Sequence, residues 1–176
     1  MKIFTCIKQV PGISEVRIDP KSNTLIREGV PSIMNPHDKH AIELGVSIKE
    51  RYGAEIIAIS MGPPQAESVL REALAMGADK AYLLTDRAFA GSDTLATSHT
   101  LALAIKKLLK LSEEKEPYLI ICGTQASDGD TDQVGPELAD ELNVTQITYA
   151  TNYDMKDKNT IIVEREFKKD ELVVIE

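Results

Sequence analysis

Residues 54–62 read AEIIAISMG, a nearly unbroken apolar run that ends in glycine. Apolar residues at every position, rather than at alternate ones, are typical of a strand buried on both faces of a parallel sheet. The following stretch, PPQAESVLREALAMGADK (63–80), begins with prolines, carries apolar residues at helical spacing and reaches a glycine at position 77. Val69, Leu70, Ala73 and Leu74 are expected on the inner face of this helix. A buried strand followed by an amphipathic helix is the repeating unit of an α/β fold.

The same unit recurs on both sides of this segment. Strands are predicted over residues 2–10 (KIFTCIKQV), 80–85 (KAYLLT) and 117–123 (PYLIICG), and helices over residues 38–53, 92–111 and 131–143. Asp38 is expected to cap the first of these helices, and Ser92 or Asp93 the second. The series predicts a single domain over residues 1–176, with three layers and a mainly parallel sheet between helices.

Two segments depart from this pattern. Residues 11–36 are rich in proline and are predicted to form a long excursion with a small hairpin within residues 16–29, of the kind that is functional or docked on a partner. Residues 151–176 show extended runs separated by charged turns and are predicted to be antiparallel strands added to one edge of the sheet. The last residues, LVVIE, stop within such a strand, so we expect the polypeptide to be incomplete.

The composition excludes several functions. The net charge is −8 and the basic residues are scattered, which argues against nucleic acid because its binding needs a basic face. The two cysteines, Cys6 and Cys122, lie in apolar runs without the C-x-x-C spacing of a zinc or redox motif. They indicate a reducing compartment, and we expect a cytoplasmic protein. The N-terminus resembles a first strand rather than a signal peptide, and no run is long enough to insert into a membrane.

Residues 123–136, GTQASDGDTDQVGP, carry acids at alternate positions, Asp128, Asp130 and Asp132. The spacing resembles the start of an EF-hand calcium loop, but Gln133 and Ala139 stand where that loop requires glycine and glutamate. A magnesium site at Asp128 and Asp130 with a bound phosphate stays open as an alternative. A hydrolytic site is not indicated, because no nucleophile and base are recognisable nearby.

The same segment lies between a predicted strand and a predicted helix, at the edge of the sheet where open α/β folds bind ligands. A helix start offers unpaired N–H groups and the positive end of its dipole, which suit a phosphate. The side-chain amides of Gln125 and Gln133 can form hydrogen bonds with an adenine edge or a ribose. The aspartates are expected to cap the helix or face solvent. The alternative is an ordinary capped turn. Neither G-x-G-x-x-G nor G-x-x-x-x-G-K-[ST] is present.

GSDTLAT (91–97) is a second helix start. Thr94 and Thr97 lie three residues apart, on one side of the first helical turn. Together with the backbone they can hold a second phosphate. The alternative is ordinary capping by Ser92 or Asp93.

Five stretches, in order along the chain, together resemble the β subunit of electron-transfer flavoproteins. They are KQVP (8–11), IMNPHDKHAIE (33–43), MGPPQAESVLREALAMGAD (61–79), DRAFAGSDTLATS (86–98) and CGTQASDGDTDQVGPELAD (122–140). The resemblance implies an adenine-nucleotide α-hydrolase-like fold and a heterodimer with an α subunit that holds FAD. The family continues past residue 176 with an arm that embraces the α subunit, and this chain lacks that arm.

The resemblance also implies a cofactor. In ordinary members the β subunit holds an AMP without a redox role, and in electron-bifurcating members the same pocket holds a second FAD. Residues 86–98 resemble the bifurcating type, which implies FAD that accepts electrons from NADH and passes them to the α-subunit FAD and a low-potential acceptor. The implied electron partners are an acyl-CoA dehydrogenase or quinone reductase and ferredoxin or flavodoxin. Two alternatives remain: a β subunit with AMP, and a stand-alone ATP- or AMP-binding regulatory protein.

Finally, the resemblance implies cofactor-binding residues, with no catalytic residue and no metal ligand. These residues are Cys6, Asn35, Pro36, His37, Asp38, Met61, Asp93, Thr94, Thr97, Gly123, Thr124, Gln125, Ala126, Ser127, Asp128, Gly129, Asp130, Thr131, Asp132, Gln133 and Val134. Two positions depart from the family pattern: Ser127 stands where isoleucine is usual, and Asp132 where a small or amide residue is expected. We expect the Asp132 side chain to face solvent.

Overall fold

The computed structural model describes residues 1–12, 31–112, 116–157, 159–168 and 171–175, so the hairpin predicted within residues 16–29 lies outside the described residues. In chain order the elements are β1 (Lys2–Cys6), β2 (Gln9–Pro11), β3 (Ser32–Met34), α1 (Pro36–Tyr52), β4 (Glu55–Met61), the short turn η1 (Pro64–Ala66), α2 (Glu67–Met76), β5 (Lys80–Leu84), the short turn η2 (Arg87–Phe89), α3 (Thr94–Leu111), β6 (Tyr118–Cys122), α4 (Val134–Leu142), β7 (Ala150–Met155), β8 (Ile161–Lys168) and β9 (Glu171–Ile175).

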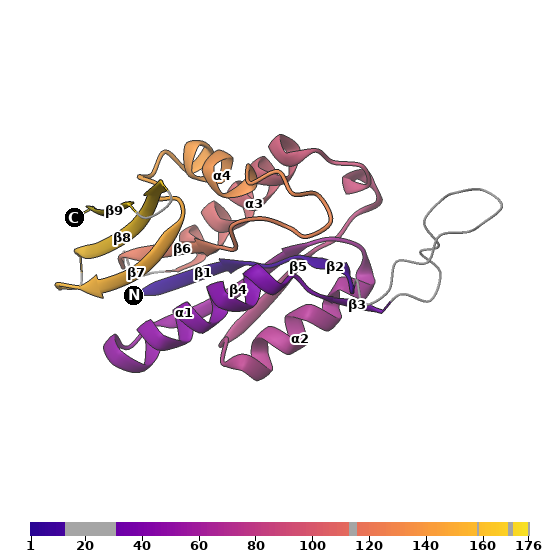
Figure 1. Cartoon of the computed structure of the whole chain (residues 1–176). Helices are drawn as coiled ribbons and strands as arrows, with labels where there is room; N and C mark the ends of the chain where they lie inside the picture. The colour runs from indigo at the N-terminus through magenta and orange to yellow at the C-terminus, as the bar shows by residue number, and fades with distance from the viewer. Residues whose placement is uncertain (13–30, 113–115, 158, 169–170, 176) are drawn as a thin grey trace.

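A parallel sheet of four strands, in the order β5-β4-β1-β6, forms the centre of the molecule (Figure 1). The predicted α/β fold is therefore confirmed. The strand predicted over residues 2–10 is wrong in its extent, because β1 ends at Cys6. Gln9–Pro11 instead pairs antiparallel with Ser32–Met34 and forms a two-stranded ladder at the base of the long excursion.

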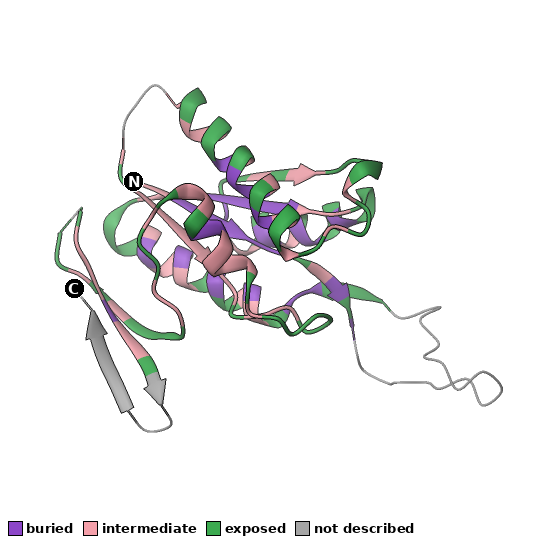
Figure 2. Ribbon diagram, turned by 90° about the horizontal axis from the view of Figure 1, so that it is seen from above, coloured by how far each residue is buried: buried purple, intermediate pink, exposed green. Residues whose placement is uncertain are grey.

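Helices cover both faces of this sheet. Ile3 and Ile56 point to the face covered by α1 and α2, while Phe4 and Ile59 point to the face covered by α3 and α4. All four side chains are fully buried, and the buried residues concentrate along the sheet and the inner helix faces (Figure 2). Because successive residues of a strand point to opposite faces, burial of both faces explains why the strands are apolar at every position.

Two details of the helices differ from the expectation. α1 begins at Pro36, two residues before the predicted start, so Asp38 lies inside its first turn and does not cap it. On α2, Val69, Leu70 and Ala73 are buried as predicted, but Leu74 is 43% exposed. The cap predicted for α3 is confirmed at Asp93, whose side chain accepts a hydrogen bond from the Ala96 N–H.

The C-terminal strands are antiparallel, as predicted. They form a sheet of their own in the order β7-β8-β9 and do not extend the edge of the parallel sheet. Tyr153 of β7 packs beside the core on the α1 side, and its hydroxyl lies 2.9 Å from the Ser47 hydroxyl of α1. Through Tyr153 the small sheet thus contacts α1.

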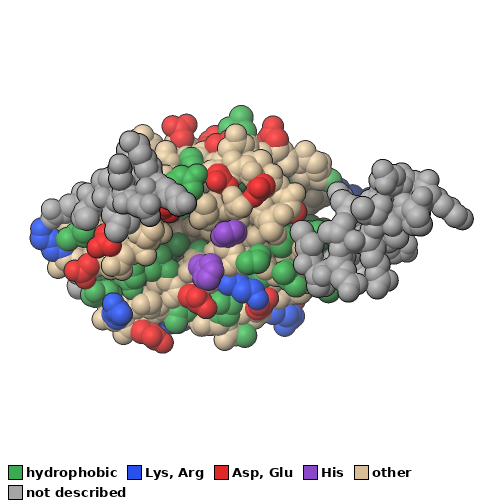
Figure 3. All heavy atoms as spheres, in the orientation of Figure 1, with side chains coloured by type: hydrophobic (Ala, Val, Ile, Leu, Met, Phe, Trp, Pro, Cys, Tyr) green, Lys and Arg blue, Asp and Glu red, His purple; other side chains and the backbone are tan. Residues whose placement is uncertain are grey.

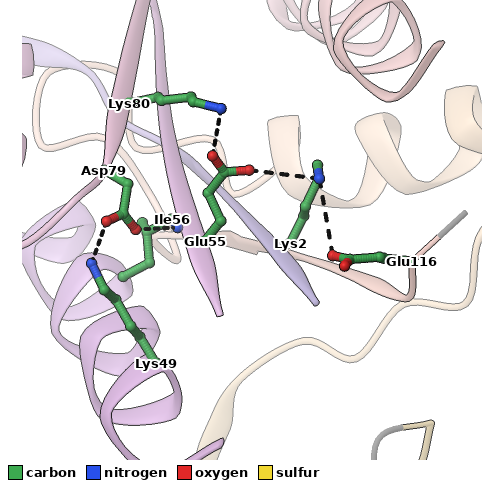
Figure 4. A network of polar contacts seen from close by, with 7 residues as sticks. All are labelled: Lys2, Lys49, Glu55, Ile56, Asp79, Lys80 and Glu116. Carbon is green, nitrogen blue, oxygen red and sulfur yellow. Dashed lines mark hydrogen bonds and ion pairs between the residues drawn. The ribbon is translucent and has the colours of Figure 1, made fainter. Parts of the chain in front are cut away.

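Charged side chains join the amino ends of the four parallel strands (Figure 4). Lys2 at the start of β1 lies 3.6 Å from Glu55 at the start of β4 and 3.9 Å from Glu116, just before β6. Lys80 at the start of β5 lies 2.5 Å from Glu55. The pairs are partly exposed, so each contributes little to stability.

Asp79, the residue before β5, joins the same end of the sheet to α1. Its carboxylate accepts hydrogen bonds from Lys49 Nζ at 2.5 Å and from the Ile56 N–H at 2.9 Å. Burial acts to raise the pKa of Asp79, but these hydrogen bonds and the charges of Lys49 and Lys80 hold it below its usual value. The carboxylate is therefore charged at neutral pH, and this end of the sheet is a structural junction.

The turn after α2 requires glycine. Gly77 has φ +124°, and a Cβ at this position would lie 3.0 Å from Cγ2 of Val46 on α1. We expect Gly77→Ala to lower the free energy of unfolding by about 1–3 kcal/mol, because backbone strain and a steric contact add. Gly91→Ala is the control, since Gly91 also has a positive φ but has open space around it. Urea denaturation of both variants measures the difference; equal losses would show that the Val46 contact costs nothing.

Candidate nucleotide-binding site

The central sheet has a topological switch point between β1 and β6. From β1 the chain continues to β4 and β5 on one side and later returns to place β6 on the other side. The segments that leave the carboxyl ends of β1 and β6 therefore diverge, and at such a point open α/β folds have the crevice in which they bind ligands. The start of α1 and the loop over residues 123–133 meet at this point.

Asp38 ties the two strand ends together. Its side chain is 6% exposed, and its Oδ2 accepts a hydrogen bond from the Lys8 N–H, just after β1, at 2.7 Å. The Gly123 N–H, just after β6, and the Asn35 side chain also donate to this carboxylate. Burial raises the pKa of Asp38 to about 6, although these hydrogen bonds and the charge of His37 oppose the rise. A single carboxylate thus fixes both walls of the crevice.

The buried side chain of Asn35 holds the loop above the crevice. Its Nδ2 donates to the Gln125 carbonyl at 2.7 Å, and its Oδ1 accepts from the Ser127 N–H at 3.2 Å. One residue further on, the Asp128 carboxylate pairs with Lys8 Nζ at 2.6 Å. The loop is therefore fastened to the β1 end and to the start of α1 by both its backbone and a side chain.

The acids of the loop were expected to cap the following helix or to face solvent. They do not cap it, because α4 begins at Val134 and the residue before it, Gln133, makes no side-chain cap, but Asp128 and Asp130 are exposed. Asp130 and Asp132 instead take left-handed backbone conformations, each with φ 55°. Asp and Asn enter this region more readily than most residues, because their short polar side chains fit it.

The expectation that Asp132 faces solvent is wrong. Its Oδ2 accepts a hydrogen bond from the Tyr149 hydroxyl at 3.2 Å, and its Oδ1 is buried without a hydrogen-bond partner. Tyr149 itself has φ 56° and is 51% exposed. This contact joins the loop to the residue that immediately precedes β7, which sequence reasoning did not foresee.

Sequence reasoning also missed Glu137 and Ser98, which join the starts of α3 and α4. The Thr94 hydroxyl lies 3.0 Å from Glu137 Oε1 and 3.3 Å from Gln133 Oε1, and the Ser98 hydroxyl donates to Glu137 Oε2 at 3.1 Å. The signal for this junction was the helical spacing, because Ser98 follows Thr94 and Glu137 follows Gln133 by four residues. Thr97 has a different role: its hydroxyl donates to the Asp93 carbonyl at 2.7 Å.

Cys6 and Met61 lie below the loop, on the face of the sheet covered by α3 and α4. Both pack in the cluster that contains Phe4, with Val134 of α4 beside it. The hydrogen bond with Cys122 is the main cause that raises the pKa of the Cys6 thiol well above its usual value, and burial adds to it. These side chains form an apolar floor.

The predicted site residues thus fall into two groups. Asn35, Pro36, His37, Asp38 and residues 123–128 line the switch point, whereas Asp93, Thr94 and Thr97 lie at the start of α3, and Gln133 joins the two groups. Thr124, Gly129, Asp130 and Thr131 are exposed, and the Ala126 carbonyl accepts hydrogen bonds from the N–H groups of Gly129 and Asp130. That these residues bind a cofactor stays a prediction.

The surroundings of the loop are acidic. Acidic side chains gather over α4 and the loop that precedes it on the face shown in Figure 3. Among the described residues, no three His, Cys, Asp or Glu side chains lie close enough together to hold a metal ion. A hollow of about 160 Å³, lined by Lys2, Lys80 and Leu111 among others, lies at the opposite, amino end of the strands. Since the ligand edge of an open α/β sheet is the carboxyl end, we place the site at the switch point.

Comparison with known proteins identifies the family. Residues 22–175 match the family described as Electron transfer flavoprotein domain. The Electron transfer flavoprotein subunit beta of Clostridium acetobutylicum is 57% identical over 155 residues, which are 88% of this chain and 57% of that protein. This chain belongs to the electron-transfer flavoprotein family. Its resemblance to the β subunits of that family, predicted from the five stretches quoted above, is confirmed.

Two further relatives carry more specific names. The Caffeyl-CoA reductase-Etf complex subunit CarD of Acetobacterium woodii is 53% identical over 163 residues, or 92% of this chain and 60% of that protein. Protein FixA of Bradyrhizobium diazoefficiens is 49% identical over 166 residues, or 94% of this chain and 57% of that protein. The chain therefore spans about three fifths of the length of these relatives. In the part of the chain that the structure describes, no helix combines the length and apolarity of a membrane span.

The raised pKa of Asp38 makes stability depend on pH. Because the folded pKa of about 6 lies above the usual aspartate value of 3.8, the carboxyl stays protonated to higher pH in the folded state than in the unfolded state, and stability falls as pH rises from 4 to 7. We expect the loss to be about 2–3 kcal/mol relative to Asp38→Asn, measured by urea unfolding across that range. Asp140→Asn, at an exposed position of α4, is the control. Identical pH profiles for wild type and Asp38→Asn would contradict this assignment.

Gly123 leaves room for the Asp38 carboxylate. A Cβ at residue 123 would lie 2.2 Å from Asp38 Oδ1 and 2.8 Å from the backbone carbon of His37. We expect Gly123→Ala to lower the free energy of unfolding by about 2–4 kcal/mol, because buried atoms must move apart. Gly129→Ala, which enters open space in the same loop, is the matched control and should cost less than about 1 kcal/mol. Similar losses in both variants would disprove the close packing at Gly123.

Proposed function

We propose that this chain is the nucleotide-binding part of an electron-bifurcating electron-transfer flavoprotein β subunit, and that the switch point holds an FAD. The observation that carries the proposal is the junction between two helix starts, where the Thr94 hydroxyl of α3 lies 3.3 Å from Gln133 Oε1, just before α4. One helix start suits one phosphate, and FAD brings two. AMP, the alternative cofactor, has one phosphate and would need only one of the two helix starts.

The chemistry of the donors fits a diphosphate. No side chain caps the start of α4, so the N–H groups of its first turn can point to a phosphate. The Lys8 ammonium lies at the crevice, where a phosphate can share it with Asp128. Asp128 and Glu137 oppose the anion, and the backbone dipoles and Lys8 must outweigh them.

The protein would hold and orient the cofactor while the cofactor carries the reaction. When bound, FAD supplies the transfer of hydride and electrons from NADH. Asp38 and Asn35 would keep the crevice and the loop in place, and Cys6 and Met61 would give an apolar floor. No side chain of this chain is assigned an acid or base role in the reaction.

The proposal includes partners. In this scheme the protein pairs with an α subunit that carries the second FAD, and it works in the cytoplasm with an acyl-CoA dehydrogenase or quinone reductase and with ferredoxin or flavodoxin. The name of the Acetobacterium woodii relative, a subunit of a caffeyl-CoA reductase complex, supports a reductase partner. A stand-alone regulatory protein is less well supported, because the family match covers residues 22–175.

The test is a count of cofactors in the full-length protein assembled with its α subunit. Two FAD per heterodimer are expected after denaturation and chromatography of the released nucleotides. Thr94→Ala should weaken the β-subunit FAD about tenfold or more, because a hydrogen bond to a charged group contributes about 1.5–3 kcal/mol. The α-subunit FAD should be unaffected.

Thr100→Ala is the matched control, because the Thr100 hydroxyl donates to the Ala96 carbonyl of its own helix. This variant should retain both flavins. One FAD and one AMP per wild-type heterodimer would refute the bifurcating type and leave the AMP type. Full flavin content in the Thr94→Ala variant would show that the start of α3 does not bind the cofactor.

A further inference from the structure

Two cysteines lie side by side on the central strands. Cys6 ends β1 and Cys122 ends β6, and the two residues are partners in the parallel register of these strands. Adjacent strands run about 4.8 Å apart, which falls within the Cα separations of about 4.4–6.8 Å that disulfides span. Both residues are free cysteines.

Their side chains point the same way. Partners in register project to the same face of a sheet, and Cys6 and Cys122 both belong to the cluster under α3 and α4. The Cys122 side chain is the main cause that raises the pKa of the Cys6 thiol, which fits two sulfur atoms close to one another. The sulfur atoms therefore already face one another, and a bond between them requires only that the strand ends approach.

We propose that Cys6 and Cys122 form a dithiol site that closes to an intramolecular disulfide when the protein meets a hydroperoxide. The Cys122 sulfur attacks the peroxide, whose O–O bond breaks, and becomes a sulfenic acid while the other oxygen leaves as water or alcohol. The Cys6 sulfur then attacks the Cys122 sulfur, so the S–S bond forms and the S–O bond breaks. The Cys6 proton leaves with the hydroxyl as water. Two thiols are oxidised and one peroxide is reduced.

The two cysteines differ in access, which sets this order. Cys122 is half-buried and contacts the first turn of α4. A Cβ added at Gly135 of that turn would lie 3.7 Å from the Cys122 Cβ. Cys6 is only 8% exposed, so peroxide reaches Cys122 first, and Cys6 is its register partner for the second step. Because Gly135 has no side chain, the first turn of α4 packs closely beside Cys122.

Formation of the disulfide would act directly on the switch point. The backbone N–H groups of Lys8 and Gly123, which both donate to the Asp38 carboxylate, lie within two residues of the cysteine pair. Bridged cysteines bring their Cβ atoms to about 3.8 Å, closer than parallel strands hold them, so the bond is strained and readily reduced. The disulfide is therefore of the reversible kind.

The experiment is peptide mapping of the native protein after brief exposure to hydrogen peroxide. Remaining thiols are blocked with N-ethylmaleimide under denaturing conditions, and trypsin then releases Cys6 in residues 3–8 and Cys122 in residues 116–156. We expect these two peptides linked, with the loss of two hydrogen atoms, and we expect dithiothreitol to separate them. Blocked thiols in both peptides, or links only between two copies of the chain on a non-reducing gel, would overturn the proposal.

Single variants separate the two roles. In Cys122→Ser, the Cys6 thiol should remain blockable after peroxide, because it is buried and has no accessible neighbour. In Cys6→Ser, the Cys122 sulfur should proceed to sulfinic acid, since no second thiol resolves the sulfenic acid. Oxidation of Cys6 alone in the Cys122→Ser protein at the wild-type rate would reverse the assigned order and contradict the mechanism. If a variant fails to fold, peptide mapping of the wild-type protein alone shows whether the Cys6–Cys122 disulfide forms.

Discussion

The hydrogen bonds to the Asp38 carboxylate are the constraint on which the candidate site depends. The carboxylate accepts from the backbone just after β1 and just after β6, the two strands that diverge at the switch point. Burial of a charged group is expensive unless hydrogen bonds compensate for it, and the raised pKa shows that the compensation is partial. The protein therefore retains a costly group where it needs two strand ends held at a fixed separation.

The two ends of the sheet are built differently. At the amino ends, ion pairs among Lys2, Glu55 and Lys80 are exposed to solvent and weak individually. At the carboxyl ends, buried polar side chains such as Asn35 and Asp38 hold a loop through backbone groups. A substitution at the amino ends changes the free energy of unfolding little. A substitution at the carboxyl ends leaves a buried polar group unpaired, which lowers the free energy of unfolding more.

Much of the fold could be predicted because its signals are local. The apolar runs of β4 and β6, the cap at Asp93 and the glycine after α2 each depend on burial or on backbone conformation within a few residues. The extent of the first strand could not be predicted, because the break after Cys6 comes from pairing between Gln9–Pro11 and Ser32–Met34, which are separated by the long excursion.

The grouping of the candidate site residues could be predicted better than their contacts. Helix starts and the strand–loop–helix order pointed to residues 91–97 and 123–136. The role of Asp38 was missed, since a residue near a helix start is by default a cap, and only the tertiary fold brings the Lys8 and Gly123 N–H groups to it. Asp132 was misjudged for the same reason, because Tyr149 reaches it from beyond α4.

The left-handed backbone of Asp130 and Asp132 bears on the thermodynamics of binding. A non-glycine residue in this region costs roughly 1–2 kcal/mol, and the loop carries this cost before any ligand arrives. The contacts from Asn35, Lys8 and Tyr149 maintain the conformation. A ligand that needs this shape meets a preorganised loop, so little of its binding free energy is lost to ordering the chain, and release need not await refolding of the loop.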